Sequence, residues 1–202
     1  MVLVFLKAPV AGKVKTRLAA GIGPERATAV YRELVARTLA NLPPGEPVRI
    51  QFDPPGSEAA IRGWLAPHLA ATDAEFRPQS AGDLGARLEK AFDDAFADGA
   101  SRVAAIGTDC PDVTPAVFGE AWRALADHDA VFGPADDGGY YLIALRKPCP
   151  TLFRGIPWSA PDTLAASLQN ARASGIAAAV LDQKLCDIDD LASLEKVGIP
   201  LG

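Results

Sequence analysis

The sequence has few residues of the kinds that form disulfides or bind soft metals. It contains 2 histidines and 3 cysteines in 202 residues. Three is an odd number, and Cys110, Cys149 and Cys186 lie far apart, so neither a disulfide framework nor a CxxC zinc site fits. We therefore expect a reducing, cytoplasmic setting. The scarcity of histidine favours Mg²⁺ or Mn²⁺ on oxygen ligands over zinc.

Long hydrophobic runs and an excess of positive charge are also missing. The opening run Val2–Leu6 is too short for a signal peptide core or a membrane span, so it predicts a strand. The chain has 20 Lys and Arg against 25 Asp and Glu, a net charge of −5, which argues against nucleic acid as a partner. Hydrophobic residues make up 49%, which excludes disorder, and no linker interrupts the chain. We predict one domain over residues 1–202.

Apolar runs alternate along the chain with segments of helical periodicity, which predicts an α/β fold with a mainly parallel sheet and helices on both faces. In the helix predicted over Asp83–Ala97, Leu84, Leu88, Phe92 and Phe96 form one apolar stripe. The predicted strands are Val2–Leu6, Val48–Phe52, Arg102–Ile106, Ala130–Phe132, Tyr140–Leu145 and Ile176–Leu181. The predicted helices are Pro24–Asn41, Ser57–Leu65, Asp83–Ala97, Pro115–Ala126, Pro161–Ala173 and Asp189–Val197. Ligands of such sheets bind in the loops at the carboxyl ends of the strands.

The loop after the first strand gathers positive charge. Residues 1–24 hold Lys7, Lys13, Lys15 and Arg17 and no acid, so this +4 segment leaves −9 for the rest of the chain. The loop runs Lys7-Ala8-Pro9-Val10-Ala11-Gly12-Lys13-Val14-Lys15-Thr16-Arg17-Leu18. Its backbone N–H groups and cations can converge on phosphate, with Arg17 as a bidentate contact and Lys15 as a point charge. A solvated basic loop is the alternative.

Two further loops contain candidate residues. Asp109 comes directly after a buried strand, where α/β enzymes hold a hard cation against phosphate. Cys110 is interpreted as a small apolar filler, since no histidine lies near it in sequence. In Gln79-Ser80-Ala81-Gly82-Asp83-Leu84-Gly85-Ala86-Arg87, the glycines permit close approach of a planar base, although Asp83 is equally a helix N-cap.

The last two candidate loops are rich in aspartate. Asp136-Asp137-Gly138-Gly139 precedes a strand, and an Asp-Gly hairpin turn explains Asp137-Gly138 but not the second charge. Asp187 and Asp189 alternate, so in an extended segment both face the same side and could complete a metal site with Asp109. Asp189 or Asp190 could instead cap the C-terminal helix.

Taken in order, the five loops resemble the DUF2064 family. The resemblance covers Lys7 to Leu194 and rests on Lys-x-Pro-x-x-Gly-x-Val-Lys-Thr-Arg-Leu, Gly-Asp-Leu-Gly-x-Arg, Gly-Thr-Asp-Cys-Pro, Gly-Pro-Ala-x-Asp-Gly-Gly-Tyr-Tyr-Leu-Ile and Asp-Ile-Asp. Members are called radical-SAM/selenodomain-associated transferases or glycosyltransferases, with the nucleotide-diphospho-sugar transferase (GT-A) fold. The chain departs from the family at Ala11, Ala160 and Asp190-Leu191, where Pro, Thr and Thr-Pro are usual.

The resemblance implies a role for residues of each loop. Nucleotide binding is assigned to Lys7, Ala8, Pro9, Gly12, Lys15, Arg17, Gln79, Gly82, Asp83, Arg87 and Asp109. Asp109 would bind the metal with Asp187 or Asp189 as its partner. The acceptor or sugar pocket would consist of Asp137, Gly138, Gly139, Trp158 and Ser159.

Three functions remain open, of which the resemblance to the family favours the first. The first is a glycosyltransferase that uses a nucleotide-diphospho-sugar and a small-molecule acceptor, with Mg²⁺ or Mn²⁺, Lys15 and Arg17 on the leaving diphosphate and Asp137 on the acceptor hydroxyl. The second is a nucleotidyltransferase that joins a nucleotide monophosphate to a phosphorylated small molecule and releases pyrophosphate, which would use the many cations of the loop. The third is a non-catalytic nucleotide-binding protein.

Overall fold

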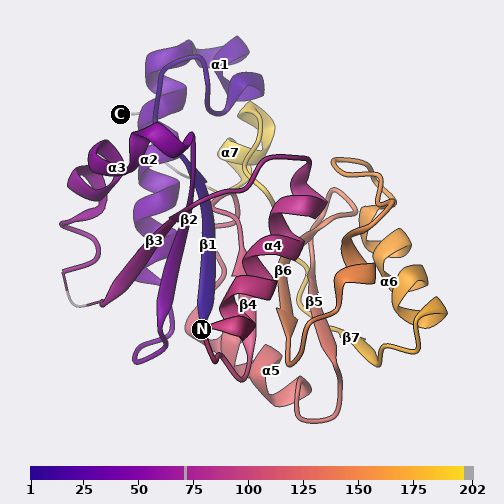
Figure 1. The fold of residues 1–202 in the computed structure, drawn as a ribbon. Helices are drawn as coiled ribbons and strands as arrows, with labels where there is room; N and C mark the ends of the chain where they lie inside the picture. The colour runs from indigo at the N-terminus through magenta and orange to yellow at the C-terminus, as the bar shows by residue number, and fades with distance from the viewer. Residues whose placement is uncertain (71, 198–202) are drawn as a thin grey trace.

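The computed structural model describes residues 1–70 and 72–197. Seven strands form one sheet in the order β3-β2-β1-β4-β6-β5-β7 (Figure 1). The strands are β1 Val2–Lys7, β2 Val48–Asp53, β3 Ala74–Pro78, β4 Val103–Ile106, β5 Ala130–Pro134, β6 Tyr140–Leu145 and β7 Ala178–Val180. Four of the strand pairs are parallel, and β6 runs antiparallel to both β4 and β5. The predicted fold class is confirmed; residue 71 and residues 198–202 of the predicted domain lie outside the described residues.

The helices cover both faces of the sheet. They are α1 Thr16–Ile22, α2 Pro24–Ala40, α3 Glu58–Leu65, α4 Leu84–Ala97, α5 Pro115–Ala124, α6 Thr163–Ala173 and α7 Leu191–Val197, with short 3₁₀ helices η1 Pro55–Ser57 and η2 Pro150–Phe153. One face packs on α2, α3 and α5 and the other on α4 and α6. None of the described helices has the length and apolarity needed to cross a membrane.

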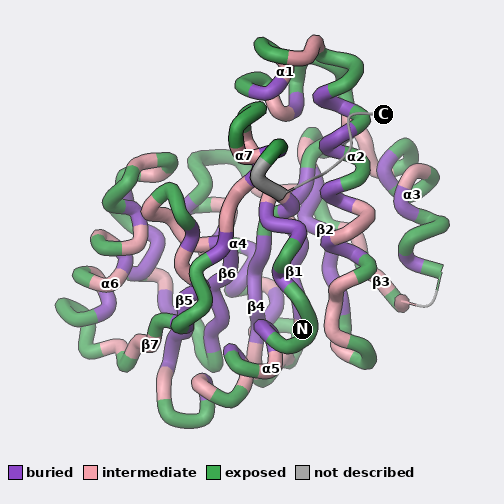
Figure 2. Tube along the Cα trace, turned by 180° about the vertical axis from the view of Figure 1, so that it is seen from behind, coloured by how far each residue is buried: buried purple, intermediate pink, exposed green. Residues whose placement is uncertain are grey.

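Burial on both faces explains the strand sequences. Val2, Val4 and Leu6 of β1 belong to one core cluster, whereas Leu3 of the same strand belongs to the cluster on the other face. A strand covered on both sides needs a continuous apolar run rather than an alternating one. In Figure 2 the buried segments accordingly follow the strands through the centre of the molecule.

Two elements were not predicted. The segment Lys7–Leu18 was expected to be a loop throughout, but α1 begins within it at Thr16. Strand β3 pairs with β2 at the edge of the sheet. Its residues are exposed or half-exposed and include no apolar run from which the strand could have been predicted. A third cluster, in which Leu18, Leu34, Ile188 and Leu194 meet, packs α1 and α7 against α2 at one end of the sheet.

The arrangement of the strands determines where the loops meet. Strands β1, β2, β3 and β4 are mutually parallel, and β5 shares their direction because it is antiparallel to β6, which is antiparallel to β4. The loops after β1, β3, β4 and β5 therefore leave the sheet on the same side, at the carboxyl ends of these strands. This is the side on which α/β folds bind ligands.

Candidate active site

The loops on this side of the sheet surround a cleft with two compartments. The first is a cavity of about 710 Å³, which we call the basic pocket because five basic side chains line it: Lys7, Lys13, Lys15, Arg17 and Arg87. The second, of about 280 Å³, we call the acidic pocket because four aspartates line it: Asp109, Asp137, Asp187 and Asp189. Both pockets share Phe5, Leu84, Gly107, Asp109, Ser159 and Asp189, so they form one continuous cleft.

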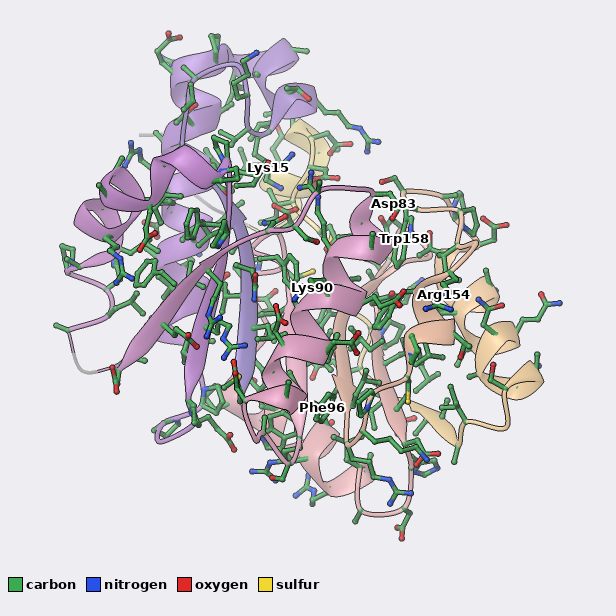
Figure 3. All side chains as sticks on the ribbon, viewed as in Figure 1. Lys15, Asp83, Lys90, Phe96, Arg154 and Trp158 are labelled. Atoms are coloured by element: carbon green, nitrogen blue, oxygen red, sulfur yellow. The ribbon has the colours of Figure 1, made fainter. Side chains whose placement is uncertain are left out.

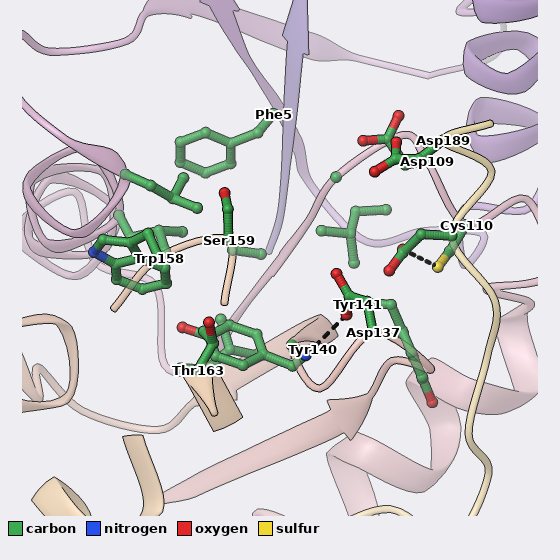
Figure 4. Close-up of a pocket in the computed structure, with 18 residues that line it drawn as sticks. Phe5, Asp109, Cys110, Asp137, Tyr140, Tyr141, Trp158, Ser159, Thr163 and Asp189 are labelled. Carbon is green, nitrogen blue, oxygen red and sulfur yellow. Dashed lines mark hydrogen bonds between the residues drawn. The ribbon is translucent and has the colours of Figure 1, made fainter. Parts of the chain in front are cut away.

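Segments far apart in sequence supply the cleft. Figure 3 shows Lys15, Asp83 and Trp158 at one end of the molecule, whereas Phe96, at the other end of α4, lies well away from them. Figure 4 shows Phe5 and Trp158 on one side of the acidic pocket and Asp109, Asp137 and Asp189 on the other. The structure thus brings together the five loops that the sequence singled out.

Lys15 is the most constrained cation of the basic pocket. Its side chain is only 4% exposed, and its Nζ lies 2.5 Å from Asp109 Oδ1, 3.0 Å from Asp189 Oδ1 and 2.5 Å from the Ile188 carbonyl oxygen. Burial lowers the pKa of Lys15, but Asp109 and Asp189 raise the pKa by more, so the ammonium stays charged. The expectation that Lys15 meets phosphate directly must be qualified, because its three N–H donors already have partners.

The backbone of the cleft is strained at two places. Lys15 has φ 47° and Ser159 has φ 61°, and no other non-glycine residue among those described has a positive φ. Such conformations are rare for residues with a Cβ and concentrate at functional sites. Both residues line the basic pocket, and Ser159 also lines the acidic pocket.

The other predicted cations differ in their exposure and in their hydrogen bonds. Arg17 is 73% exposed, with its guanidinium 3.6 Å from Asp189 Oδ2. Arg87 is held by the Gly82 carbonyl oxygen at 3.1 Å and by Gln79 Oε1 at 3.0 Å. The amide nitrogen of Gln79 donates to carbonyl oxygens of Leu6 and Gln51, so Gln79 joins the ends of two strands and orients Arg87.

Several predicted residues shape the loops, and some of them line neither pocket. Asp83 is the N-cap of α4, where its carboxylate accepts from the Ala86 N–H at 2.9 Å, and it lines the basic pocket as well. Ala8, Pro9 and Gly12 of the first loop and Gly138 of the fourth line neither pocket. A Cβ on Gly138 would lie 2.0 Å from the Pro161 carbonyl oxygen, so this position lets the loop touch the segment before α6.

Asp109 and Asp189 are the pair that could hold a metal. Their side chains are 47% and 44% exposed, and each has a second carboxylate oxygen that Lys15 does not use. No three metal-ligating side chains cluster among the described residues. The donor set therefore fits a hard cation that takes its remaining ligands from phosphate and water. Asp190, which accepts from the Ser193 N–H at 2.9 Å, caps α7, so Asp189 does not have to.

Asp187 has a different environment from Asp189. Its carboxylate accepts a hydrogen bond from the Cys110 thiol at 2.6 Å and faces the acidic pocket. Burial, followed by the charges of Asp137, Asp109 and Asp189, raises the pKa of Asp187 to about 6, although the thiol hydrogen bond opposes the shift. Burial and Asp187 raise the pKa of Cys110, so Cys110 is a buried thiol rather than a nucleophile.

Asp137 sits in a hairpin turn, as one of the two interpretations of its loop predicted. β5 and β6 pair antiparallel on either side of it, and its carboxylate accepts from the Gly139 N–H at 2.8 Å. The turn nevertheless places this carboxylate in the acidic pocket. Asp137 can therefore stabilise the hairpin turn and still belong to the candidate site.

Sequence reasoning missed part of the cleft. Leu84 was assigned to the core stripe of its helix, but it is 43% exposed and lines both pockets. Phe5 and Tyr140 were given no role in the site, although Tyr140 belongs to the motif of the fourth loop, and Tyr31 was interpreted only as part of a helix. Their positions near the carboxyl end of β1 and the start of β6 were the available signal for the first two.

Solved structures resemble this chain over most of its length. A candidate nucleotide-diphospho-sugar transferase from Desulfovibrio desulfuricans G20 is 33% identical, with a TM-score of 0.86, 97% of this chain covered and 84% of the other. CMP:2-keto-3-deoxy-manno-octonic acid synthetase complexed with CTP has 13% identity and a TM-score of 0.57, with 98% and 95% covered. Rv0371C from Mycobacterium tuberculosis, complexed with manganese, has 14% identity and a TM-score of 0.54, with 97% and 96% covered.

The last two likenesses concern the fold alone, while the first extends to the sequence. No curated protein matches the chain. The family described as "Uncharacterized protein conserved in bacteria (DUF2064)" matches residues 37–160, more than half of the chain. The chain therefore belongs to the DUF2064 family.

Proposed function

We propose that the chain is a divalent-metal-dependent glycosyltransferase that transfers a sugar from a nucleotide-diphospho-sugar to a small-molecule acceptor. One observation carries the proposal: a basic pocket and an acidic pocket open into each other at Asp109 and Asp189. The basic pocket matches the anionic diphosphate of a nucleotide-sugar, and the acidic pocket matches an uncharged hydroxyl compound that receives the sugar. The description of the 33% identical protein as a candidate nucleotide-diphospho-sugar transferase supports the same assignment.

The basic pocket would hold the nucleotide. Arg17 is exposed and suits a bidentate contact with phosphate, while Lys7 and Lys13 add positive charge around it. Arg87 is positioned beforehand by Gln79 and Gly82. A cavity of about 710 Å³ falls within the range of about 300–1,000 Å³ that is usual for ligand sites.

Asp109 and Asp189 would bind the metal through the carboxylate oxygens that Lys15 leaves unused. A bound Mg²⁺ or Mn²⁺ supplies stabilisation of the negative charge that builds up on the departing diphosphate. Lys15 lies beside both carboxylates and Arg17 lies beside Asp189, so they add positive charge at the point where that charge develops. Asp187, turned towards Cys110, is less suited as a ligand.

The transfer step uses Asp137. The acceptor hydroxyl oxygen forms a bond to the anomeric carbon of the sugar, and the bond from that carbon to the diphosphate oxygen breaks. The electron pair of the broken bond leaves with the nucleoside diphosphate, and the hydroxyl proton passes to the Asp137 carboxylate. Asp137 suits this task because it lines the acidic pocket and, among the described residues, its carboxylate accepts a hydrogen bond from the Gly139 N–H alone.

A nucleotidyltransferase is the second candidate. Five basic side chains in one pocket favour it, because a triphosphate carries more negative charge than a diphosphate-sugar. In that reaction an acceptor phosphate would attack the α-phosphorus of a nucleoside triphosphate, and pyrophosphate would leave. The acidic pocket weighs against it, because among the described residues no cation lines that pocket to receive the phosphate.

The two reactions are separated by their products. Purified protein is incubated with Mg²⁺ or Mn²⁺ and either nucleotide-diphospho-sugars or nucleoside triphosphates, each with candidate acceptors. We expect release of nucleoside diphosphate from nucleotide-sugars, and loss of that release in Asp137→Asn with nucleotide affinity retained. Pyrophosphate release from a triphosphate would overturn the proposal in favour of nucleotidyl transfer. Nucleotide binding with neither product would leave a binding protein.

A further inference from the structure

The acidic pocket contains two carboxylates without a basic partner. Asp137 binds the Gly139 N–H, and Asp187 binds the Cys110 thiol, but among the described residues no Lys, Arg or His contacts either carboxylate. Asp109 and Asp189 differ from them, since both form ion pairs with Lys15 and Asp189 also lies 3.6 Å from Arg17. The pocket therefore carries uncompensated negative charge on the side away from the basic pocket.

The opposite wall of the acidic pocket is aromatic and apolar. Phe5, Tyr140 and Trp158 line it, and the rings of Tyr140 and Trp158 meet edge to face at 6.3 Å. Gly85 makes room for this wall, because a Cβ there would lie 2.3 Å from the Phe153 carbonyl oxygen and 2.9 Å from Trp158 Nε1. Such surfaces pack against the apolar face of a ring.

The two walls select one kind of molecule. Ionised carboxylates only accept hydrogen bonds, so they bind hydroxyl or ammonium donors and repel groups that are themselves anionic acceptors. A volume of about 280 Å³ lies near the lower end of the range for small-molecule sites, about 300 Å³, which suits a single ring.

We propose that the acceptor is a single-ring polyhydroxyl compound, neutral or bearing an ammonium group, and that phosphorylated and carboxylated acceptors are excluded. This inference rests on the proposed function, because it takes the acidic pocket as the acceptor site. Asp137 and Asp187 determine the charge preference, and Trp158 and Phe5 receive the ring face.

The test uses three probes that share one ring and differ in charge: methyl α-D-glucoside, glucosamine and glucose 6-phosphate. Their binding is measured by saturation-transfer NMR on the protein with Mg²⁺ and the best-bound of ADP, CDP, GDP and UDP. We expect the phosphorylated ring to bind on the order of 100-fold more weakly than the other two. In the double variant D137N/D187N, the ratio between the affinities for the uncharged ring and for glucose 6-phosphate should fall at least about tenfold. Asp136→Asn is the matched control, because Asp136 belongs to the same loop but lines neither pocket.

Each other outcome contradicts the inference. Equal or tighter binding of glucose 6-phosphate, an unchanged gap in the double variant, or no binding of any ring would overturn it. Displacement of the rings by a nucleotide-sugar but not by the nucleoside diphosphate would assign the pocket to the donor sugar instead.

A parallel measurement separates this inference from the proposed function. If nucleoside diphosphate is never released while the charge preference holds, the glycosyl transfer fails and the pocket assignment stands. If release occurs but is faster with phosphorylated acceptors, the transfer stands and the acceptor assignment fails.

Discussion

The basic and acidic pockets differ in whether the protein balances its own charges. In the basic pocket Lys15 is paired with Asp109 and Asp189, and Arg87 is held by Gln79 and Gly82. In the acidic pocket, the carboxylates of Asp137 and Asp187 accept hydrogen bonds from an N–H and a thiol, and no basic side chain of the described residues contacts them. Charges that are already paired hold a geometry ready for a ligand, whereas unpaired charges select the ligand by its sign.

The largest effect is expected where the two pockets meet. Asp109→Asn should abolish metal-dependent nucleotide binding, because Asp109 lines both pockets and is one of the two carboxylates that we propose as metal ligands. Calorimetric titration of nucleotide with and without Mg²⁺ measures this. With EDTA present, the variant and the wild type should bind nucleotide alike. An Mg²⁺-dependent gain in affinity that survives the substitution would remove Asp109 from the metal site.

A smaller effect is expected within the basic pocket. Arg17→Ala should weaken nucleotide binding by about 2 kcal/mol, as is usual for a charge-assisted hydrogen bond, without altering probe binding in the acidic pocket. Arg172→Ala, on the exposed face of α6, is the matched control. If both variants bind nucleotide as the wild type does, the first loop is only a solvated basic surface.

The smallest effect concerns stability in the acidic pocket. The pKa of Asp187 is raised from 3.8 to about 6, so the folded protein keeps this proton at pH values where the unfolded chain has released it. Stability from this group therefore falls as the pH rises from about 4 to about 6, and the loss is complete above that range. Asp187→Asn should raise the free energy of unfolding by about 1 to 2 kcal/mol at neutral pH and leave it unchanged near pH 4.

Urea denaturation at several pH values measures this difference, with Asp136→Asn as the control for loss of one charge. A uniform gain at every pH would mean that Asp187 is not destabilised by its own ionisation. In that case the unpaired carboxylates of the acidic pocket would destabilise the folded protein less than their geometry implies.

Local patterns in the sequence were enough to predict the fold. The helices α2 and α4 and the strands β1, β2, β4 and β6 were predicted to within a residue or so, because apolar periodicity there reflects burial directly. Strand β3 is the edge strand of the sheet and has little apolar character, so it shows no apolar periodicity. Helix α1 has only seven residues and follows Lys15, whose φ is positive, so it shows no such periodicity either. The antiparallel pairing of β6 with β4 joins strands that are not consecutive in sequence, and local sequence does not encode it.

The loops that form the candidate site could be identified from the sequence, but the pairing of their side chains could not. Loops that follow buried strands were correctly expected to lie together, since parallel strands end at one edge. The contact between Lys15 and Asp189, however, joins residues 174 positions apart. Whether an aspartate faces a lysine, a thiol or a backbone N–H is decided by packing of distant elements, which is why Lys15 was predicted to be available and Asp187 was left as an alternative to Asp189.

The ammonium of Lys15, placed between Asp109 and Asp189, has a practical consequence for handling the protein. Because the chain supplies its own counter-ion to this carboxylate pair, the folded state does not need a divalent cation to offset their repulsion. Dialysis against a chelator should leave the protein folded. The metal would then bind together with the nucleotide and dissociate with it in each turnover, rather than stay permanently bound to the protein.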